Sequence, residues 1–178
     1  MQAARGAPLN DPPSGAGGGP HLGLLLVVAA AVLVLDVTSK IVAVAQLSDR
    51  EPVELLGGLL TLRLVRNPGA AFGMAQGLTI VLTVVAAVVA VMILRFGRRL
   101  RSASWAVALG LVLGGAVGNL VDRILREPAP LRGHVIDFLE LPSWPVFNVA
   151  DSAIVTGGAV LVLLSVLGIS HDGTRGKH

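Results

Sequence analysis

The sequence contains no cysteine, so this chain cannot form a disulfide bond, a thiolate metal site or a cysteine nucleophile. Histidine is also scarce, because three of the four lie in the tails and only His134 lies between them. A histidine-rich metal site is therefore not expected, and we interpret His134 as a loop residue. No serine stands in a nucleophile motif with a paired histidine, which argues against a serine hydrolase.

Charged side chains are also few, at 14% of the 178 residues, whereas hydrophobic residues make up 53%. Several apolar runs approach the length needed to cross about 30 Å of hydrocarbon, so the composition indicates an integral membrane protein. The net charge is +3, but the basic residues are too sparse and too close to the membrane flanks to follow a phosphate backbone. Nucleic acid is therefore not an expected partner.

Four apolar runs are expected to be transmembrane helices, at residues 22–47, 78–94, 103–121 and 149–169. The first run could instead be a cleavable signal peptide, but it is long and lacks a small-residue cleavage site at its end. Residues 1–21 are rich in glycine and proline and are expected to form a disordered tail. The expected organisation is this tail, a four-helix membrane domain at 22–169 and a polar C-terminal tail at 170–178.

The segment at residues 48–77 is too polar and too interrupted by proline and glycine to span a membrane. Within it, LLTLRLVR alternates, with leucines on one face and Thr61, Arg63 and Val65 on the other, which is typical of a half-buried strand. NPGAAFG follows at 67–73 and predicts a turn that lets the backbone approach another group closely. The alternative is an ordinary loop in which proline and glycine only end the strand. The expected fold class is an all-α membrane protein with a small extracytoplasmic β-type platform between helices 1 and 2.

Four arginines within seven residues, at positions 95, 98, 99 and 101, separate the second and third runs. The positive-inside rule predicts that this short loop is cytoplasmic, and four spans then put both termini on the same side. In the third run, a stripe of small residues recurs every four positions and would let a neighbouring helix pack backbone to backbone. The stripe consists of Ala106, Gly110, Gly114 and Gly118.

This topology carries polar residues from separate stretches of the chain toward the outer face. They are Asp36, Asn67, Asn119, Asp122, Arg123, Asp137, Asn148 and Asp151. Acids beside a bilayer are costly and indicate a functional site. Two neighbouring carboxylates in a partly desolvated site share a proton and can act together as base and acid. Structural ion pairs are the alternative for Asp36 with Lys40, one turn apart, and for Asp122 with Arg123.

Five motifs in order resemble the lipoprotein signal peptidases, also called signal peptidase II. They are DVTSK at 36–40, NPGAAF at 67–72, GGAVGNLVDR at 114–123, GHVIDF at 133–138 and FNVADSAI at 147–154. The resemblance implies a four-helix aspartic endopeptidase of the bacterial inner membrane, with its active site near the outer face. Its expected partners are membrane lipids and a diacylglyceryl-modified prolipoprotein, which is cut before the lipidated cysteine. No cofactor or metal is implied, and we expect a monomer.

Carried over residue by residue, the resemblance implies that Asp137 and Asp151 form the catalytic dyad. Positions that support the dyad or contact substrate are matched by Asp36, Lys40, Asn67, Gly69, Asn119, Asp122, Arg123 and Asn148. Either Asp122 or Asp137 could partner Asp151, and spacing does not decide. We favour Asp137, because the adjacent Arg123 would keep Asp122 ionised. Asp151 should be rigid at the start of the fourth helix, whereas Asp137 is expected in a loop closed by Pro142 and Pro145.

Two other classes of function remain alternatives. A small transporter or proton-coupled channel would use intramembrane acids as an ion relay, but the sequence has no internal repeat and its acids cluster at one face. A non-catalytic membrane scaffold predicts that the acids can be replaced without loss of function.

Overall fold

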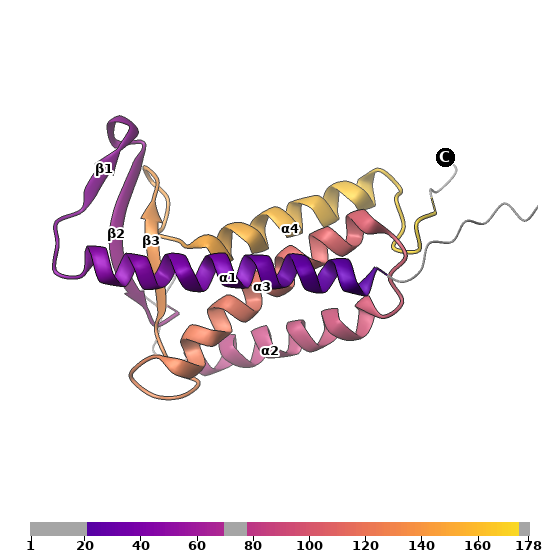
Figure 1. Cartoon of the computed structure of the whole chain (residues 1–178), viewed down its shortest axis with the longest axis horizontal. Helices are drawn as coiled ribbons and strands as arrows, with labels where there is room; N and C mark the ends of the chain where they lie inside the picture. Colours follow the sequence, from indigo (N-terminus) through magenta and orange to yellow (C-terminus); the bar gives the residue numbers. More distant parts are fainter. Residues whose placement is uncertain (1–20, 70–77, 175–178) are drawn as a thin grey trace, which may run out of the picture.

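The computed structural model describes residues 21–69 and 78–174. Four helices run along the molecule and a small sheet lies at one end (Figure 1). The helices are α1 (Leu22–Leu47), α2 (Leu78–Gly97), α3 (Ala103–Leu125) and α4 (Val149–Val166), and each is long and apolar enough to cross a membrane. The predicted four-helix membrane architecture is confirmed. The N-terminal tail lies outside the described residues, as does part of the 67–73 turn.

The helices differ from the expected spans mainly at their ends. α2 continues to Gly97 and α3 to Leu125, so that both helices include charged residues that we had placed beyond the spans. Arginine is a good helix former and can extend its charged group toward water, so an apolar run does not define where a helix ends. The longer α3 carries Asp122 and Arg123 in its last turn rather than after it.

α3 is the central helix of the bundle, because it packs against α1, α4 and α2, whereas α2 packs chiefly against α3. Its glycines allow this close approach. A Cβ atom at Gly110 would lie 2.8 Å from the backbone oxygen of Leu25, and one at Gly114 would lie 2.7 Å from that of Ala29. The predicted role of the small-residue stripe is therefore confirmed: it lets α3 pack backbone to backbone, here against α1.

Replacing Gly114 with valine is expected to lower the midpoint of thermal unfolding by several degrees. The added side chain would overlap the backbone of Ala29 and the side chain of Val32, and overpacking of this kind costs about 1–3 kcal/mol. Gly158→Val in α4 is the matched control, because a Cβ atom there meets nothing within 4 Å. Equal midpoints for the two variants in detergent would show that α3 does not need the small stripe.

The sheet consists of β1 (Val53–Leu55), β2 (Leu60–Asn67) and β3 (Val135–Glu140), with a short 3-10 turn at Leu56–Gly58. The strands are antiparallel in the order β1-β2-β3. One face of the sheet packs on the end of α1, where Ile136, Phe138 and Leu64 cluster with Ala43. The predicted strand is confirmed as β2, but its pairing with β3 shifts register between Leu62 and Val65, so the predicted alternation is interrupted there. Leu64 packs with the cluster at the end of α1, whereas Arg63 and Val65 line a cavity.

The expectation that Asp137 lies in a loop is wrong, because this residue is in the middle of β3 and pairs with Val65 of β2. The loop was inferred from Pro142 and Pro145, but both prolines come after the strand. Val135, Ile136, Phe138 and Leu139 surround the acid with residues that favour strands. The β-type platform is thus completed by a strand between α3 and α4, which the sequence-based prediction did not include.

Candidate functional site

Asp137 and Asp151 meet where the sheet joins the bundle. Asp137 extends from β3, and Asp151 lies in the first turn of α4. Both line a cavity of about 500 Å3, together with Asn67 and Pro68 at the end of β2 and Phe147 before α4. The two candidate dyad residues therefore share one cavity although they come from different elements.

Asp137 is almost fully buried and accepts hydrogen bonds from two side-chain amides. Asn67 Nδ2 donates to Asp137 Oδ2 over 2.9 Å, and Asn148 Nδ2 donates to Oδ1 over 2.6 Å. Burial raises the pKa of Asp137 to about 6, while the Asn67 amide opposes the rise and the nearby charge of Asp151 adds to it. A carboxyl with this pKa can hold or release a proton near neutral pH.

Asp151 is held by the start of its own helix. The Asn148 side chain accepts a hydrogen bond from Asp151 N over 2.9 Å, and Asp151 Oδ2 accepts one from Asn148 N over 3.2 Å. This reciprocal pair is a capping box, which fixes the first turn of α4. The other oxygen, Oδ1, accepts a hydrogen bond from Asn119 Nδ2 over 2.8 Å. The prediction that Asp151 is rigidly placed at the start of this helix agrees with this geometry.

Asn148 connects the two acids directly, because it caps the helix that carries Asp151 and donates to Asp137. Its Nδ2 also lies 3.3 Å from Asn119 Oδ1, so the two asparagines link both carboxylates to α3. Asn148 has no solvent exposure. Such a network orients the two acids before any substrate arrives.

Beneath the dyad candidates, Lys40 forms the centre of a buried charge cluster. Its Nζ lies 2.7 Å from Asp36 Oδ2 and 2.9 Å from Asp122 Oδ2, and it donates to Asn119 Oδ1 over 3.0 Å. The other oxygen of Asp36 accepts a hydrogen bond from Ala150 N over 2.9 Å, at the start of α4. The Asp36–Lys40 ion pair considered from the sequence is confirmed, and it joins α1 to α3 and α4.

Asp122 does not form the expected ion pair with Arg123. Its cationic partners are Lys40 and Arg126, and its Oδ2 also accepts a hydrogen bond from Ile136 N over 3.2 Å. Neighbouring residues on a helix point in different directions, whereas residues four apart share a face. The Asp122–Arg126 spacing was visible in the sequence, but our prediction passed over it. Asp122 therefore supports the backbone of β3 just before Asp137.

Asn67 and Gly69 form the described part of the NPGAAFG turn. Gly69 N donates to Asn67 Oδ1 over 2.8 Å, which leaves the Asn67 amide directed at Asp137. Gly69 has a φ of +103°, a conformation that favours glycine. A Cβ atom there would lie 3.6 Å from Arg123 Nη1, so the turn approaches this guanidinium closely, as expected. Residues 70–73 of the motif lie outside the described residues.

Arg123 is the one member of the predicted site set whose side chain makes no hydrogen bond to the others within the described residues. It is buried, and its Nη1 has no hydrogen-bond partner there. The remaining predicted residues are joined by the contacts given above. Within residues 21–69 and 78–174, no group of three or more His, Asp or Glu side chains has the geometry of a metal site.

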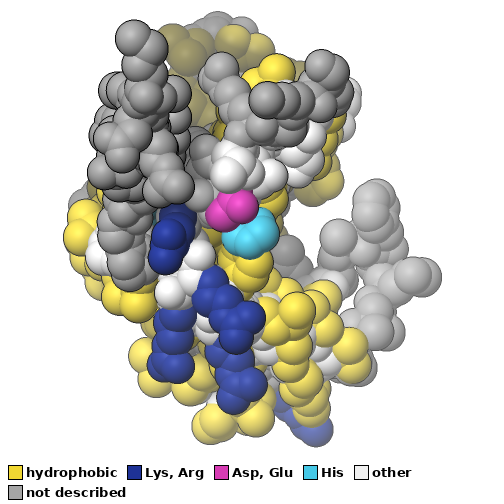
Figure 2. Space-filling view, turned by 90° about the vertical axis from the view of Figure 1, so that its right-hand side faces the viewer, with side chains coloured by type: hydrophobic (Ala, Val, Ile, Leu, Met, Phe, Trp, Pro, Cys, Tyr) yellow, Lys and Arg dark blue, Asp and Glu magenta, His cyan; other side chains and the backbone are white. Residues whose placement is uncertain are grey.

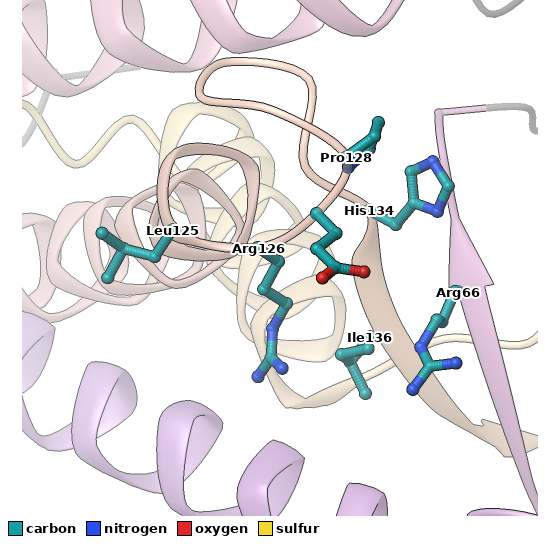
Figure 3. Close-up of a pocket in the computed structure, with 7 residues that line it drawn as sticks. Arg66, Leu125, Arg126, Pro128, His134 and Ile136 are labelled. Carbon is teal, nitrogen blue, oxygen red and sulfur yellow. The ribbon is translucent and has the colours of Figure 1, made fainter.

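A second cavity, of about 470 Å3, lies between the C-terminal end of α3, the C-terminal end of β2 and the N-terminal end of β3. Figure 3 shows Arg66 and Arg126 extending to the same side of it, with Ile136 between them. His134 also lines this cavity, from the loop before β3, rather than the cavity of the two acids. Arg66 lines both cavities, so they meet at β2.

Comparisons with known proteins agree with these features. The family model described as signal peptidase (SPase) II matches residues 28–167. A lipoprotein signal peptidase of Rhodococcus jostii (strain RHA1) is 56% identical over 152 residues, which cover 85% of this chain and 77% of the relative. One of Mycobacterium avium (strain 104) is 54% identical over 166 residues, covering 93% and 88%. A bacterial membrane enzyme solved by the in meso method at 1.9 Å resolution shares the fold, with a TM-score of 0.74 at 23% identity, covering 88% of this chain and 100% of that chain.

Proposed function

This chain belongs to the signal peptidase II family, and on that premise we propose that it cuts diacylglyceryl-modified prolipoproteins just before the lipidated cysteine. We further propose that Asp137 and Asp151 activate the water molecule that makes the cut. The observation that carries this proposal is that Asn148 holds both carboxylates beside one cavity. No cofactor is required by the mechanism.

In the proposed reaction, Asp151 is the base and Asp137 the acid. The water oxygen attacks the scissile carbonyl carbon, Asp151 takes one water proton, and Asp137 gives its proton to the carbonyl oxygen. The resulting tetrahedral diol collapses as the carbon–nitrogen bond breaks. Asp151 then protonates the leaving amine, and Asp137 recovers its proton from the hydroxyl group. Burial of Asp137 and the helix start around Asp151 support this division of roles.

Asp122 is a weaker candidate for the partner of Asp151. It does not line the cavity, and its carboxylate contacts Lys40, Arg126 and Ile136 N. Both carboxylate oxygens are thus occupied by contacts within the protein rather than directed at the cavity. We therefore assign Asp122, with Asp36 and Lys40, to positioning the strand and the helix that carry the dyad.

The position of the site suggests how a lipid-modified substrate reaches it. The two acids lie at the sheet end of the bundle, and the arginine-rich turn after α2 lies at the other end. We propose that the arginine-rich end and both termini face the cytoplasm, so that the dyad lies near the outer face of the inner membrane. The platform would then hold the peptide while the diacylglyceryl group stays in the bilayer.

The proposal is tested by incubating the purified protein with a synthetic lipobox peptide that carries a diacylglyceryl group on its cysteine. Mass spectrometry should detect a released signal peptide that ends immediately before the lipidated cysteine, with equal yield when a chelator is present. The same peptide with an unmodified cysteine is the control and should be cut far more slowly. Absence of cleavage by folded protein in lipid would contradict the proposed activity.

The pH dependence of cleavage follows from the proposed acid. A carboxyl that donates a proton is active only below its pKa, so cleavage should fall about tenfold per pH unit above the pKa of about 6 at Asp137. Because the Asn67 amide stabilises the ionised form, Asn67→Ala should move this limb to higher pH. The measurement is kcat/KM between pH 4 and 9, and an identical limb in both proteins would exclude Asp137 as its source.

Asp122→Asn is expected to lower the yield of folded protein. It is not expected to give a well-folded protein that has lost only its catalytic activity. Removing one partner of a buried ion pair costs about 3–5 kcal/mol. Glu140→Gln is the control, because it breaks the exposed pair with Arg63, which should cost about 0–1 kcal/mol. If the Asp122→Asn protein is well folded but inactive, Asp122 rather than Asp137 would be assigned as the second acid of the dyad with Asp151.

A further inference from the structure

The end of the bundle opposite the sheet carries a concentrated positive charge. Figure 2 looks onto this end and shows Lys and Arg side chains gathered beside hydrophobic ones. The exposed arginines at 95, 98, 99 and 101 lie in the last turn of α2 and the turn that follows. Ion pairs within residues 21–69 and 78–174 involve none of these four. Within the described residues, these four arginines therefore have no ion-pair partner.

Three of these arginines line a shallow cavity of about 580 Å3 together with Met92 and Phe96. Among the residues that the structure describes, no acidic side chain lines it. Met92, Arg95 and Phe96 follow the spacing i, i+3 and i+4 on one side of the end of α2, and Arg98 and Arg99 lie in the turn directly after the helix. We call these five residues, which line the cavity together, the α2 basic face. Met92 is 63% exposed and lies further from the helix end than the arginines. The face thus changes from apolar to cationic toward the end of the helix.

We propose that the α2 basic face binds the headgroup of an anionic phospholipid. The guanidinium groups of Arg95, Arg98 and Arg99 would contact the phosphate, which arginine can bind through two parallel hydrogen bonds. An acyl chain would lie on Met92 and Phe96, deeper in the bilayer. A basic cluster directly after a membrane span is where attraction to anionic lipids is strongest. The apolar part of the cavity favours a lipid over a soluble phosphate.

The backbone around this face is held in place by the segment after α4. Arg101 N and Ser102 N both donate to His171 O, over 3.0 and 3.1 Å, and the rings of Phe96 and His171 lie 5.1 Å apart. Leu100 is fully buried beside them. The turn that presents the arginines is therefore packed against the bundle, whereas the apolar residues of α2 away from α3 remain exposed for lipid. Binding would order side chains only, which keeps its entropic cost low.

The test is native mass spectrometry of the full chain released from detergent with phosphatidylglycerol or with phosphatidylcholine of the same chain length. Wild-type protein should retain phosphatidylglycerol preferentially. Arg98→Gln with Arg99→Gln should weaken this binding about thirtyfold, from the contribution of each arginine near an anionic headgroup. Arg50→Gln with Arg132→Gln removes equal charge from exposed positions near the sheet and should leave it unchanged. Met92→Asn, with no change of charge, should also weaken it.

Three results would overturn the proposal. Equal retention of the two lipids by the wild-type protein would exclude a site for an anionic headgroup. Equal losses in the two double variants would show a general effect of net charge. Competition by glycerol phosphate as strong as by the lipid would indicate a soluble anion as the ligand. Cleavage of the lipobox peptide in detergent should be unchanged in the Arg98→Gln with Arg99→Gln variant and in Met92→Asn. The thermal unfolding midpoint should be unchanged in the Arg50→Gln with Arg132→Gln variant, so each protein is checked for folding.

Discussion

Replacing either Asp137 or Asp151 with asparagine is expected to abolish cleavage of a diacylglyceryl-modified prolipoprotein. Asparagine at 151 cannot take a proton from water, and asparagine at 137 cannot protonate the carbonyl oxygen. Each lost step of acid or base catalysis is worth about 10²–10⁴-fold in rate, and here each variant loses a group that acts in both halves of the reaction. The measurement is single-turnover release of the signal peptide, which removes effects of product release.

Both asparagine variants should still fold and insert into the membrane. At each position, one oxygen that now accepts a hydrogen bond becomes an amide, which cannot accept from Asn67 or from Asn148 N. This local cost is smaller than the loss of a buried charge pair, because neither Asp137 nor Asp151 forms an ion pair within the described residues. Glu140→Gln on the same strand as Asp137 should retain full activity. Normal processing by either dyad variant would refute the proposed mechanism.

The largest effect on stability is expected from Lys40→Met. Lys40 is fully buried and is the shared partner of Asp36 and Asp122, and it also donates to Asn119. Without it, Asp36 loses its only described cationic partner at a buried position. Removing one member of a buried ion pair costs about 3–5 kcal/mol, which is comparable with the whole stability of many proteins. We expect little folded Lys40→Met protein in membranes, measured as the monodisperse fraction after extraction.

A second variant separates charge from packing at this position. Asp36→Asn combined with Lys40→Met removes the unpaired carboxylate and should recover part of the folded protein, so the two changes should not be additive. Lys40→Arg keeps the charge but places a larger group at a fully buried position, and it should restore less. Wild-type yields of the Lys40→Met protein would show that the buried cluster does not hold α1, α3 and α4 together.

The membrane class and the order of the helices followed from the sequence because their causes are local. An apolar run of sufficient length crosses a bilayer regardless of its neighbours, and this is true of all four helices. The ion pair of Asp36 and Lys40 likewise depends on two residues one helical turn apart. The resemblance also selected residues that, apart from Arg123, the tertiary structure brings into one network.

Only the tertiary structure decided how the two acids of the proposed dyad are held. Asp137 is ordered because β3 pairs with β2, and Asn67 reaches it from 70 positions away in the chain. Likewise, Lys40 meets Asp122 and Asn119 because glycines let α3 approach α1 closely. Hydrogen-bond partners across the fold depend on how helices and strands pack, and no local pattern encodes that. The sequence by itself determined which residues carry charge beside the membrane, and packing decided which of them touch.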